Sequence, residues 1–480
     1  MNAEEEKWLS LADAWLAEHQ EELLAHLPTW LAVPSISESD KAIEGAPYGE
    51  PCAAMLKLAL RDAEEAGFKV EEHQGYAGSV IYGDNPLEIG LVSHLDVVPP
   101  GEGWIYDPFI ATQKDNFLIA RGSVDDKSAA LGNLYLLRMM RDLKVPLRHS
   151  VRLIYGLAEE TGMSDMQWYA QHCPVPLVSI VTDGYFPVNT AQKGQLNVTL
   201  AIKAGPTLST LRAGKVTNSV PDSATIALGA HSPLRTCQDP SVSQRHDSNI
   251  LYLDAKGIAG HAAFPEGSRN AAIVLLDELI AGRWLAPDDE AIAKKLSAVF
   301  GSPWGDKTQL ACEDAVSGKL TINAGVWRPA EQADSLHVDI DIRFPVSWRA
   351  EQIVAALTRA LAGIEVSIVD QKVMPAFYIS PESPVVALLM DSYNQLQQTN
   401  SEPYAMGGGT HSRVLPRAIT FGPAFPGGGV RPTFLPKGHG SPHSPDEALH
   451  IPSFIASLRI YFLALLRLDA CIMTAGAFME

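Results

Sequence analysis

The order of helical and strand patterns predicts an α/β protein with a mostly parallel sheet and an inserted α+β domain. Up to about residue 195, segments with helical spacing of apolar residues alternate with short apolar runs typical of buried strands. Residues 320–346 instead show the period-two alternation of an antiparallel hairpin. The chain has 480 residues, whereas a single hydrophobic core rarely grows beyond about 300 residues. We therefore expect two domains.

The first segment supplies the parallel-sheet pattern. Helical spacing predicts helices over residues 6–33, 52–68 and 128–143. Apolar runs predict strands over residues 78–83, 88–98, 150–160 and 177–184. In sheets of this kind, ligands bind beyond the carboxyl ends of the strands.

The pattern changes after residue 195. Half-buried strands are predicted over 195–204, 224–230 and 249–257, and helices over 269–281 and 349–364. A final segment, from residue 376, begins with a helix over 383–398 and ends with a helix over 454–473. We expect domain boundaries near residues 195/196 and 375/376. Periodicity does not reveal whether the last segment rejoins the first domain.

Composition excludes several classes of protein. The formal net charge of −19 argues against a nucleic-acid partner, which calls for a surplus of Lys and Arg. Five scattered cysteines without a CxxC pair indicate reduced thiols. The acidic N-terminus has no signal-peptide pattern, and Arg459 and Arg467 interrupt the most apolar helix. We therefore expect a cytoplasmic protein without a membrane partner.

Polar side chains gather where predicted strands end and in the adjoining loops. Singly, each has an ordinary explanation: a satisfied core histidine, an N-cap pair or a solvated turn. Jointly they would lie at one edge of the sheet, where several carboxylates repel each other unless a cation lies among them. The residues are His94 and Asp96, Asp125 and Asp126, Glu159 and Glu160, and Asp183.

These residue types are suitable ligands for zinc. Zinc binds imidazole nitrogen and carboxylate oxygen, usually with about four ligands per ion, and two ions that share a bridging carboxylate need fewer side chains. Two ions about 3.5–4 Å apart can polarise a carbonyl group and lower the pKa of a water between them. The pattern therefore indicates amide hydrolysis, with one glutamate binding metal and the other acting as general base.

Six motifs together resemble one superfamily, and they follow its order over nearly the whole chain. This superfamily is the di-zinc metallopeptidases that include carnosinases, bacterial dipeptidases, aminoacylases and desuccinylases; the bacterial carnosinase-like dipeptidases are most similar. The resemblance implies a catalytic domain built from residues 1–195 and 376–480, with residues 196–375 as a lid that binds substrate. The motifs are SHLDVVP, RGSVDDK, AEETGMSDM, TDGYFPV, GIAGHAAFPEGSRNA and GGGTHSR.

The resemblance also implies a role for each polar residue. Two Zn²⁺ ions, with Mn²⁺ or Co²⁺ as substitutes, would share Asp125 as a bridge. Glu159 would be the general base, and Asp96 would orient the imidazole of His94. The peptide between Asp125 and Asp126 would be cis. The complete implied ligand set is His94, Asp125, Glu160, Asp183 and His443.

The histidine ligand in the last segment has two candidates. The stretch KGHGSPHSPDEAL contains both His439 and His443. The family pattern places the ligand shortly before an acidic pair, and Asp446 and Glu447 follow His443. We therefore expect His443, with His439 as the alternative.

The resemblance assigns further residues to the substrate. His261 would stabilise the oxyanion of the tetrahedral intermediate, and Arg343 would bind the free carboxylate of a peptide. The sequence alone equally allows Arg343 to pair with Asp339 or Asp341. His411 departs from the family, because dipeptidases commonly have tyrosine there, and this bears on substrate preference. The remaining predicted substrate contacts are Asn218, Gly408, Gly409, Thr410 and Arg413.

The favoured function is metal-dependent hydrolysis of dipeptides or very short peptides. An N-acyl amino acid deacylase or desuccinylase remains an alternative, as does a non-catalytic protein that binds peptides. The oligomeric state, monomer or homodimer, stays open.

Overall fold

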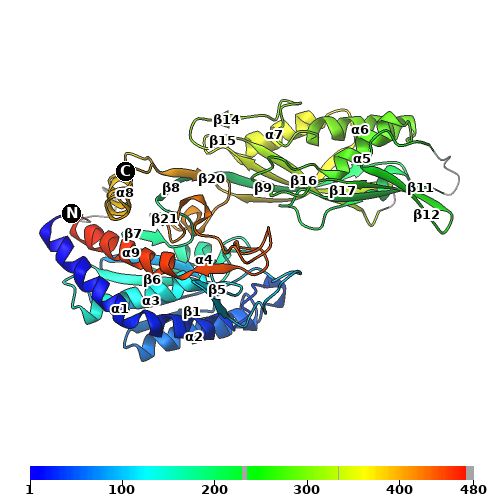
Figure 1. Ribbon diagram of the computed structural model, residues 1–480. Helices are drawn as coiled ribbons and strands as arrows, with labels where there is room; N and C mark the ends of the chain where they lie inside the picture. The colour runs from blue at the N-terminus through cyan, green and yellow to red at the C-terminus, as the bar shows by residue number, and fades with distance from the viewer. Residues whose placement is uncertain (230–234, 333, 472–480) are drawn as a thin grey trace. The chain divides into compact units, whose positions relative to one another are not determined.

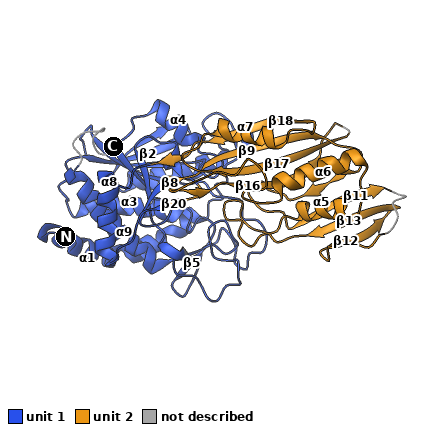
Figure 2. Cartoon of the chain, turned by 90° about the horizontal axis from the view of Figure 1, so that it is seen from above, with its two compact units in different colours: residues 1–190, 379–404, 409–480 blue, residues 191–378, 405–408 orange. Residues whose placement is uncertain are grey.

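The computed structural model describes residues 1–229, 235–332 and 334–471. These residues form two compact units, coloured separately in Figure 2. Unit 1 comprises residues 1–190, 379–404 and 409–480, and unit 2 comprises residues 191–378 and 405–408. Residue 230 of one predicted strand and residues 472–473 of the last predicted helix lie outside the described residues.

The central sheet has the strand order β1-β2-β6-β3-β7-β21-β8-β19 and belongs to unit 1, except for β19 and the end of β8, which fall within residues 191–378. Parallel pairing is confined to the four central strands β6, β3, β7 and β21, while the outer pairs are antiparallel. The predicted mostly parallel α/β class is confirmed. The strands are β1 (Lys69–His73), β2 (Ala77–Tyr82), β3 (Glu88–His94), β6 (Ser150–Gly156), β7 (Val178–Val181), β8 (Val188–Gln192), β19 (Phe377–Tyr378) and β21 (Ala418–Phe421).

Helices cover this sheet (Figure 1). Helix α3 contacts β3 and β6, α2 contacts β1 and β2, and α4 contacts β2. Helix α1 begins at a capping box in which Asn2 accepts the backbone N–H of Glu5. The helices are α1 (Ala3–Leu31), α2 (Glu50–Glu65), α3 (Lys127–Asp142), α4 (Ser164–His172), α8 (Pro384–Gln397) and α9 (Ile451–Cys471).

The last segment of the chain returns to unit 1, which periodicity could not reveal. Strand β21 lies between β7 and β8, and α9 contacts α1, α3 and α8. A small sheet has the order β22-β5-β4. Its strands are β4 (Thr112–Lys114), β5 (Phe117–Ile119) and β22 (Ala448–His450). The remaining short elements are β20 (Tyr404–Met406), η1 (Ser39–Lys41), η3 (His411–Arg413) and η4 (Pro426–Gly428).

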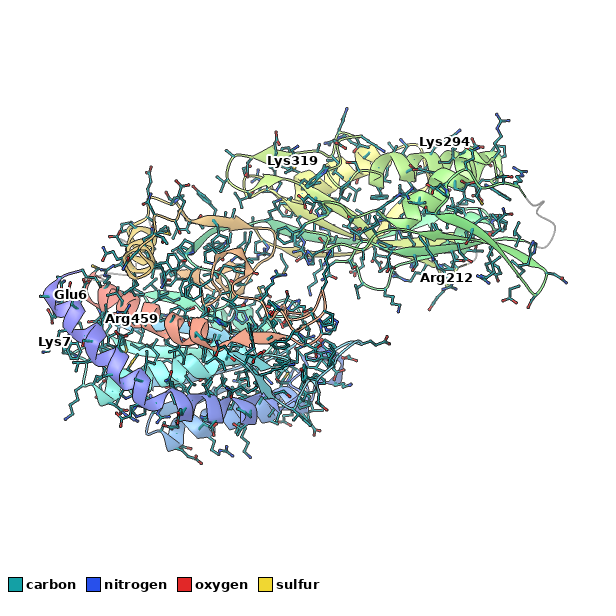
Figure 3. All side chains as sticks on the ribbon, viewed as in Figure 1. Glu6, Lys7, Arg212, Lys294, Lys319 and Arg459 are labelled. Carbon is teal, nitrogen blue, oxygen red and sulfur yellow. The ribbon has the colours of Figure 1, made fainter. Side chains whose placement is uncertain are left out.

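Helix α9 corrects one expectation. In the sequence, Arg459 and Arg467 predict a helix that is too polar for a membrane span. By length and mean hydropathy (1.6) alone, however, the helix could cross a membrane. More than half of the apolar window, 56%, is nevertheless buried. Arg459, labelled in Figure 3, pairs with Asp13 at 2.7 Å, and Arg467 pairs with Glu5 at 2.7 Å. Both arginines therefore fasten α9 to α1 inside unit 1.

Unit 2 is an antiparallel sheet with helices α5, α6 and α7 packed on it, in the strand order β12-β13-β11-β10-β16-β17-β9-β18. Strand β12 is polar and β18 is exposed along most of its length, which explains why period-two reasoning missed both. Its elements are β9 (Gly194–Lys203), η2 (Leu208–Thr210), β10 (Arg212–Ala213), β11 (Ser223–Gly229), β12 (Val242–Asp247), β13 (Ile250–Lys256), α5 (Ala271–Ala281), α6 (Pro287–Phe300), β14 (Glu313–Asp314), β15 (Gly318–Lys319), β16 (Thr321–Pro329), β17 (Ser335–Phe344), α7 (Ala350–Ala360) and β18 (Val366–Met374).

Candidate metal centre

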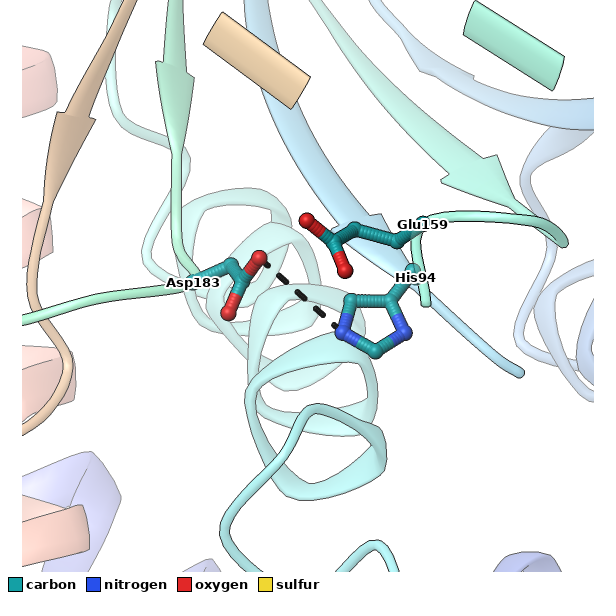
Figure 4. A group of neighbouring side chains, drawn as sticks. All are labelled: His94, Glu159 and Asp183. Atoms are coloured by element: carbon teal, nitrogen blue, oxygen red, sulfur yellow. Dashed lines mark ion pairs between the residues drawn. The ribbon is translucent and has the colours of Figure 1, made fainter. Parts of the chain in front are cut away.

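The carboxyl ends of the central strands bring the predicted ligands together. Strand β3 ends at His94, the loop after β6 carries Glu159, and Asp183 follows β7. Figure 4 shows these three side chains turned toward one another. Their potential ligand atoms all lie within 4.8 Å of each other, and the same holds for His94, Asp125 and Glu160. Two overlapping ligand groups therefore share His94.

Asp125 occupies the position expected of a bridge. Its Oδ1 lies 2.9 Å from Nε2 of His94, and its Oδ2 lies 3.0 Å from Nε2 of His443. Nε2 of His443 is also 2.9 Å from Oε1 of Glu160, and Nε2 of His94 is 3.9 Å from Oδ2 of Asp183. Each oxygen of Asp125 thus faces a different histidine, as it would if it linked two ions.

The two candidate histidines of the last segment have different surroundings. His443 contacts Asp125 and Glu160, whereas Nδ1 of His439 lies 2.6 Å from Oδ2 of Asp446. Asp446 in turn accepts the backbone N–H groups of residues 105 and 106 at 2.9 Å. His443 therefore lies within the predicted ligand group, while His439 supports a neighbouring loop.

Electrostatics at this edge favour a bound cation. Burial raises the pKa of Glu160 to about 7, and the nearby Asp125 carboxylate adds to the effect. Burial and Asp125 likewise raise the pKa of Asp183 to about 6. Burial and the Asp183 carboxylate raise the pKa of Glu159 well above its usual value. The carboxylates cannot all ionise beside each other without positive charge.

The two histidines supply that charge when metal is absent. Although burial opposes it, Asp125 and Asp96 raise the pKa of His94, and Asp125 and Glu160 raise the pKa of His443. Despite burial, hydrogen bonds from His443 and His94 hold the pKa of Asp125 far below its usual value. The donor set of imidazole nitrogen and carboxylate oxygen, with its excess of acids, therefore fits two Zn²⁺ ions.

Asp96 contacts His94 and the backbone of the two glutamates without being a proposed ligand itself, as the resemblance implies. Its Oδ1 lies 3.2 Å from Nδ1 of His94, and its backbone oxygen is 2.9 Å from the same nitrogen. Its two carboxylate oxygens also accept the backbone N–H groups of Glu159 and Glu160, at 3.2 and 3.1 Å. Asp126 accepts the backbone N–H of His94 at 3.1 Å, and the Asp125–Asp126 peptide is cis, as predicted.

Glu447 has a supporting role that sequence reasoning missed. It is fully buried and accepts the backbone N–H groups of Val124 and Asp125 at 2.7 and 2.9 Å. Its second oxygen accepts from the Arg121 guanidinium at 2.7 Å. Its only sequence signal was its place in the acidic pair after His443, which served to locate that histidine. Asp165 and His411, both fully buried, form a second support.

The predicted substrate residues of unit 2 are described within that unit. His261 accepts the backbone N–H of Ala263 on Nδ1 at 3.1 Å. Asn218 is exposed, and its backbone oxygen accepts the N–H of Ala262 at 2.8 Å. The guanidinium of Arg343 donates to both oxygens of Asp341, at 2.6 and 2.9 Å, which is the pairing that the sequence also allowed. Their roles toward substrate stay predictions.

The predicted contacts of the GGGTHSR motif are divided between the units. Gly408 belongs to unit 2, whereas Gly409, Thr410 and Arg413 belong to unit 1. Gly409 lies against the guanidinium of Arg413, so a side chain there would collide with it. The hydroxyl of Thr410 lies 2.6 Å from the hydroxyl of Thr420. The motif is therefore a packed turn, and its substrate contacts also stay predictions.

Comparison with known proteins tests the resemblance that the sequence motifs indicate. The family model described as peptidase family M20/M25/M40 matches residues 90–467. A Bacillus subtilis (strain 168) protein named "Putative dipeptidase YtjP" is 30% identical over 466 residues, covering 94% of this chain and 97% of that protein.

Solved structures share the fold at low sequence identity. The di-peptidase Dug1p of Saccharomyces cerevisiae superposes with a TM-score of 0.58 at 10% identity, over 97% of this chain and 99% of that one. Human carnosine dipeptidase 1 superposes with a TM-score of 0.55 at 13% identity, over 96% and 100%. From the sequence match and the fold, the chain belongs to peptidase family M20/M25/M40.

Proposed function

We propose that this chain is a two-zinc dipeptidase that hydrolyses the peptide bond of dipeptides or very short peptides. The observation that carries the proposal is the placement of Asp125 between two histidines, with Glu159 close to His94 and Asp183. The five predicted ligands, His443 among them, would hold the ions, and Glu159 would stay available for proton transfer.

The metals and Glu159 divide the reaction between them. Two divalent ions, held by these residues, would supply the positive charge that polarises a peptide carbonyl and makes water a better nucleophile. Glu159 accepts the proton of that water and then gives it to the leaving amine. Burial and the Asp183 carboxylate raise the pKa of Glu159 well above its usual value, which makes this carboxylate a stronger base. Asp96 keeps Glu159 in place through its backbone N–H.

The names of relatives and two residues of unit 2 support the substrate class. The names of relatives in Bacillus subtilis and Staphylococcus aureus contain "dipeptidase", and the yeast and human structures are described as dipeptidases. In unit 2, His261 would donate to the oxyanion and Arg343 would bind the free carboxylate of the peptide. The pair with Asp341 fixes the plane of the Arg343 guanidinium for that contact.

The test is a substrate panel with metal-loaded protein. Dipeptides, tripeptides and N-acyl amino acids are assayed with Zn²⁺, Mn²⁺ or Co²⁺. We expect dipeptides to be turned over fastest, and acetylation of the α-amine of a good dipeptide to abolish turnover. Equal turnover of tripeptides contradicts the dipeptidase proposal. Preference for N-acyl amino acids indicates a deacylase, and metal binding without any turnover indicates a non-catalytic protein that binds peptides.

A further inference from the structure

A buried aspartate–histidine pair lies behind the metal-binding edge. Asp165, in the first turn of α4, has both carboxylate oxygens 3.2 Å from Nε2 of His411. Both side chains have 0% exposure. A fully buried ring offers no surface to a substrate, and the bearing of His411 on substrate preference stays a prediction.

Asp165 binds the main chain that leads to the two glutamates. Its Oδ2 accepts the N–H groups of Leu157 and Ala158 at 2.7 and 2.9 Å. The next two N–H groups, of Glu159 and Glu160, are accepted by Asp96. Two buried carboxylates thus bind four consecutive amides, residues 157–160. This segment, which we call the glutamate turn, carries both the proposed base and a proposed ligand.

His411 packs against the same strand end. A Cβ added to Gly156 would collide with the carboxylate of Asp165 and the ring of His411, so glycine is required for this close approach. Gly156 is the register partner of His94 across β6 and β3. The rings of His411 and His94 meet edge to face, with centroids 6.3 Å apart and an interplanar angle of 89°. One histidine thus contacts the backbone and the ring that position the centre.

The hydrogen-bonding pattern indicates which nitrogen carries the proton. Nε2 faces a carboxylate, which only accepts hydrogen bonds, so Nε2 is the donor. Nδ1 of His411 is buried and has no hydrogen-bond partner among the described residues. At this buried position, an unpaired nitrogen acceptor costs less free energy than an unpaired N–H donor. Asp165 accordingly binds a fixed N–H of His411 as well as the glutamate turn.

We propose that Asp165 and His411 are positioning residues that hold the glutamate turn, and with it Glu159 and Glu160, in the geometry that the reaction needs. This inference rests on the proposed function, and it assigns the departure at position 411 to support of the centre. Partners of this kind typically change metal affinity or activity by about 10–100-fold when they are removed.

The chain contains a matched control pair at the other end of β6. Nδ1 of His149 lies 3.0 Å from Oδ1 of Asp469, and each side chain is 7% exposed. Asp469 also accepts backbone N–H groups, from Arg148 and His149, at 2.9 and 2.8 Å. This pair shares the burial, the ring contact and the main-chain bonds of the Asp165 pair, but it lies at the end of β6 away from the glutamate turn.

The experiment compares Asp165→Asn and His411→Phe with Asp469→Asn and His149→Phe in the full chain. We expect the first two variants to lower kcat by about 10–100-fold with KM unchanged. We also expect them to alter the visible absorption of the Co²⁺-substituted protein, because the geometry of Glu160 changes. The control variants should lower Tm while leaving kcat, measured well below their Tm, and the Co²⁺ spectrum as in the wild type. His411→Gln, which keeps an N–H donor, should recover much of kcat.

Three outcomes overturn the positioning role. One is that kcat and the Co²⁺ spectrum stay unchanged in Asp165→Asn and His411→Phe. Another is that the control variants lower kcat as strongly, which would mean loss of general stability. A third is that His411→Phe raises KM alone, which would make His411 a substrate contact. If His411→Phe does not fold, Asp165→Asn carries the comparison with the two control variants.

Failure of the proposed function is distinguishable from these outcomes. If the wild type prefers N-acyl amino acids, kcat is compared on that substrate. If the wild type turns over nothing, the Co²⁺ spectra of the four variants still decide whether the Asp165 pair shapes the centre.

Discussion

A buried aspartate–histidine pair lies at each end of β6, and the two pairs have different roles. At the amino end, Asp469 and His149 bind the chain to α9, beside Arg148. At the carboxyl end, Asp165 and His411 lie next to a group in which acids outnumber histidines. A pair of one aspartate and one histidine without a cluster of carboxylates beside it stabilises the fold. The same kind of pair beside a cluster of buried carboxylates indicates the support of a functional site.

We expect the largest effect on activity from Glu159→Gln, at the carboxyl end of β6. Amide in place of carboxylate removes the proposed base, and general-base catalysis contributes about 10²–10⁴-fold. We expect kcat to fall by about that factor while both metal ions are retained, as measured by steady-state kinetics and elemental analysis. Loss of an ion instead would show that Glu159 is a ligand and that Glu160 is the base.

His443→Ala should come next, with His439→Ala as its control. Removing His443 takes away a contact of Asp125 and Glu160, so we expect one ion to be lost at limiting zinc. At limiting zinc, activity should fall by about 10–100-fold or more, the loss typical when a residue that holds a metal ligand is removed. His439→Ala should keep both ions. The reverse result would make His439 the ligand.

A smaller, pH-dependent effect should distinguish the acid-rich end. Burial and neighbouring carboxylates raise the pKa of Glu160 to about 7 and that of Asp183 to about 6, and the pKa values of His94 and His443 are also raised. These groups therefore hold protons that metal must displace, so affinity should increase as the pH rises from 5 to 7. Calorimetry in buffers of different ionisation enthalpy should show proton release. Proton uptake would contradict the proposed ligand set.

The smallest effect on the centre should come from Asp469→Asn, which changes the pair at the amino end of β6. Leaving buried donors unsatisfied costs about 1–3 kcal/mol, so the free energy of unfolding should decrease by that amount. Denaturant titration measures this change. Zinc content and kcat should equal those of the wild type, and a fall in either would show that the two ends are coupled through β6.

Local patterns predicted much of the fold and the polar edge. Strand ends such as His94 and Asp183 carry their signal in a few consecutive residues, so the convergence of parallel strands was enough to bring them together. The bond between Asp165 and His411 spans 246 positions, and no periodicity encodes such a distance. The position of β21 between β7 and β8 was hidden for the same reason.

Side-chain partners inside one element were also undecided. Arg343 and Asp341 point to the same face of β17, so the sequence allowed both a salt bridge and a free guanidinium. Only the folded structure shows the bidentate pair. Helix α6 went unpredicted although its residues have helical spacing, because its polar first turn, PDDE, resembles a loop.

The two histidines of the centre differ in how closely they are enclosed. The side chain of His94 is 0% exposed and ends a central strand, whereas that of His443 is 51% exposed and lies in a loop rich in glycine and proline. An ion that depends on His443 should therefore exchange with the medium first. At limiting metal the protein would then pass through a form with one ion.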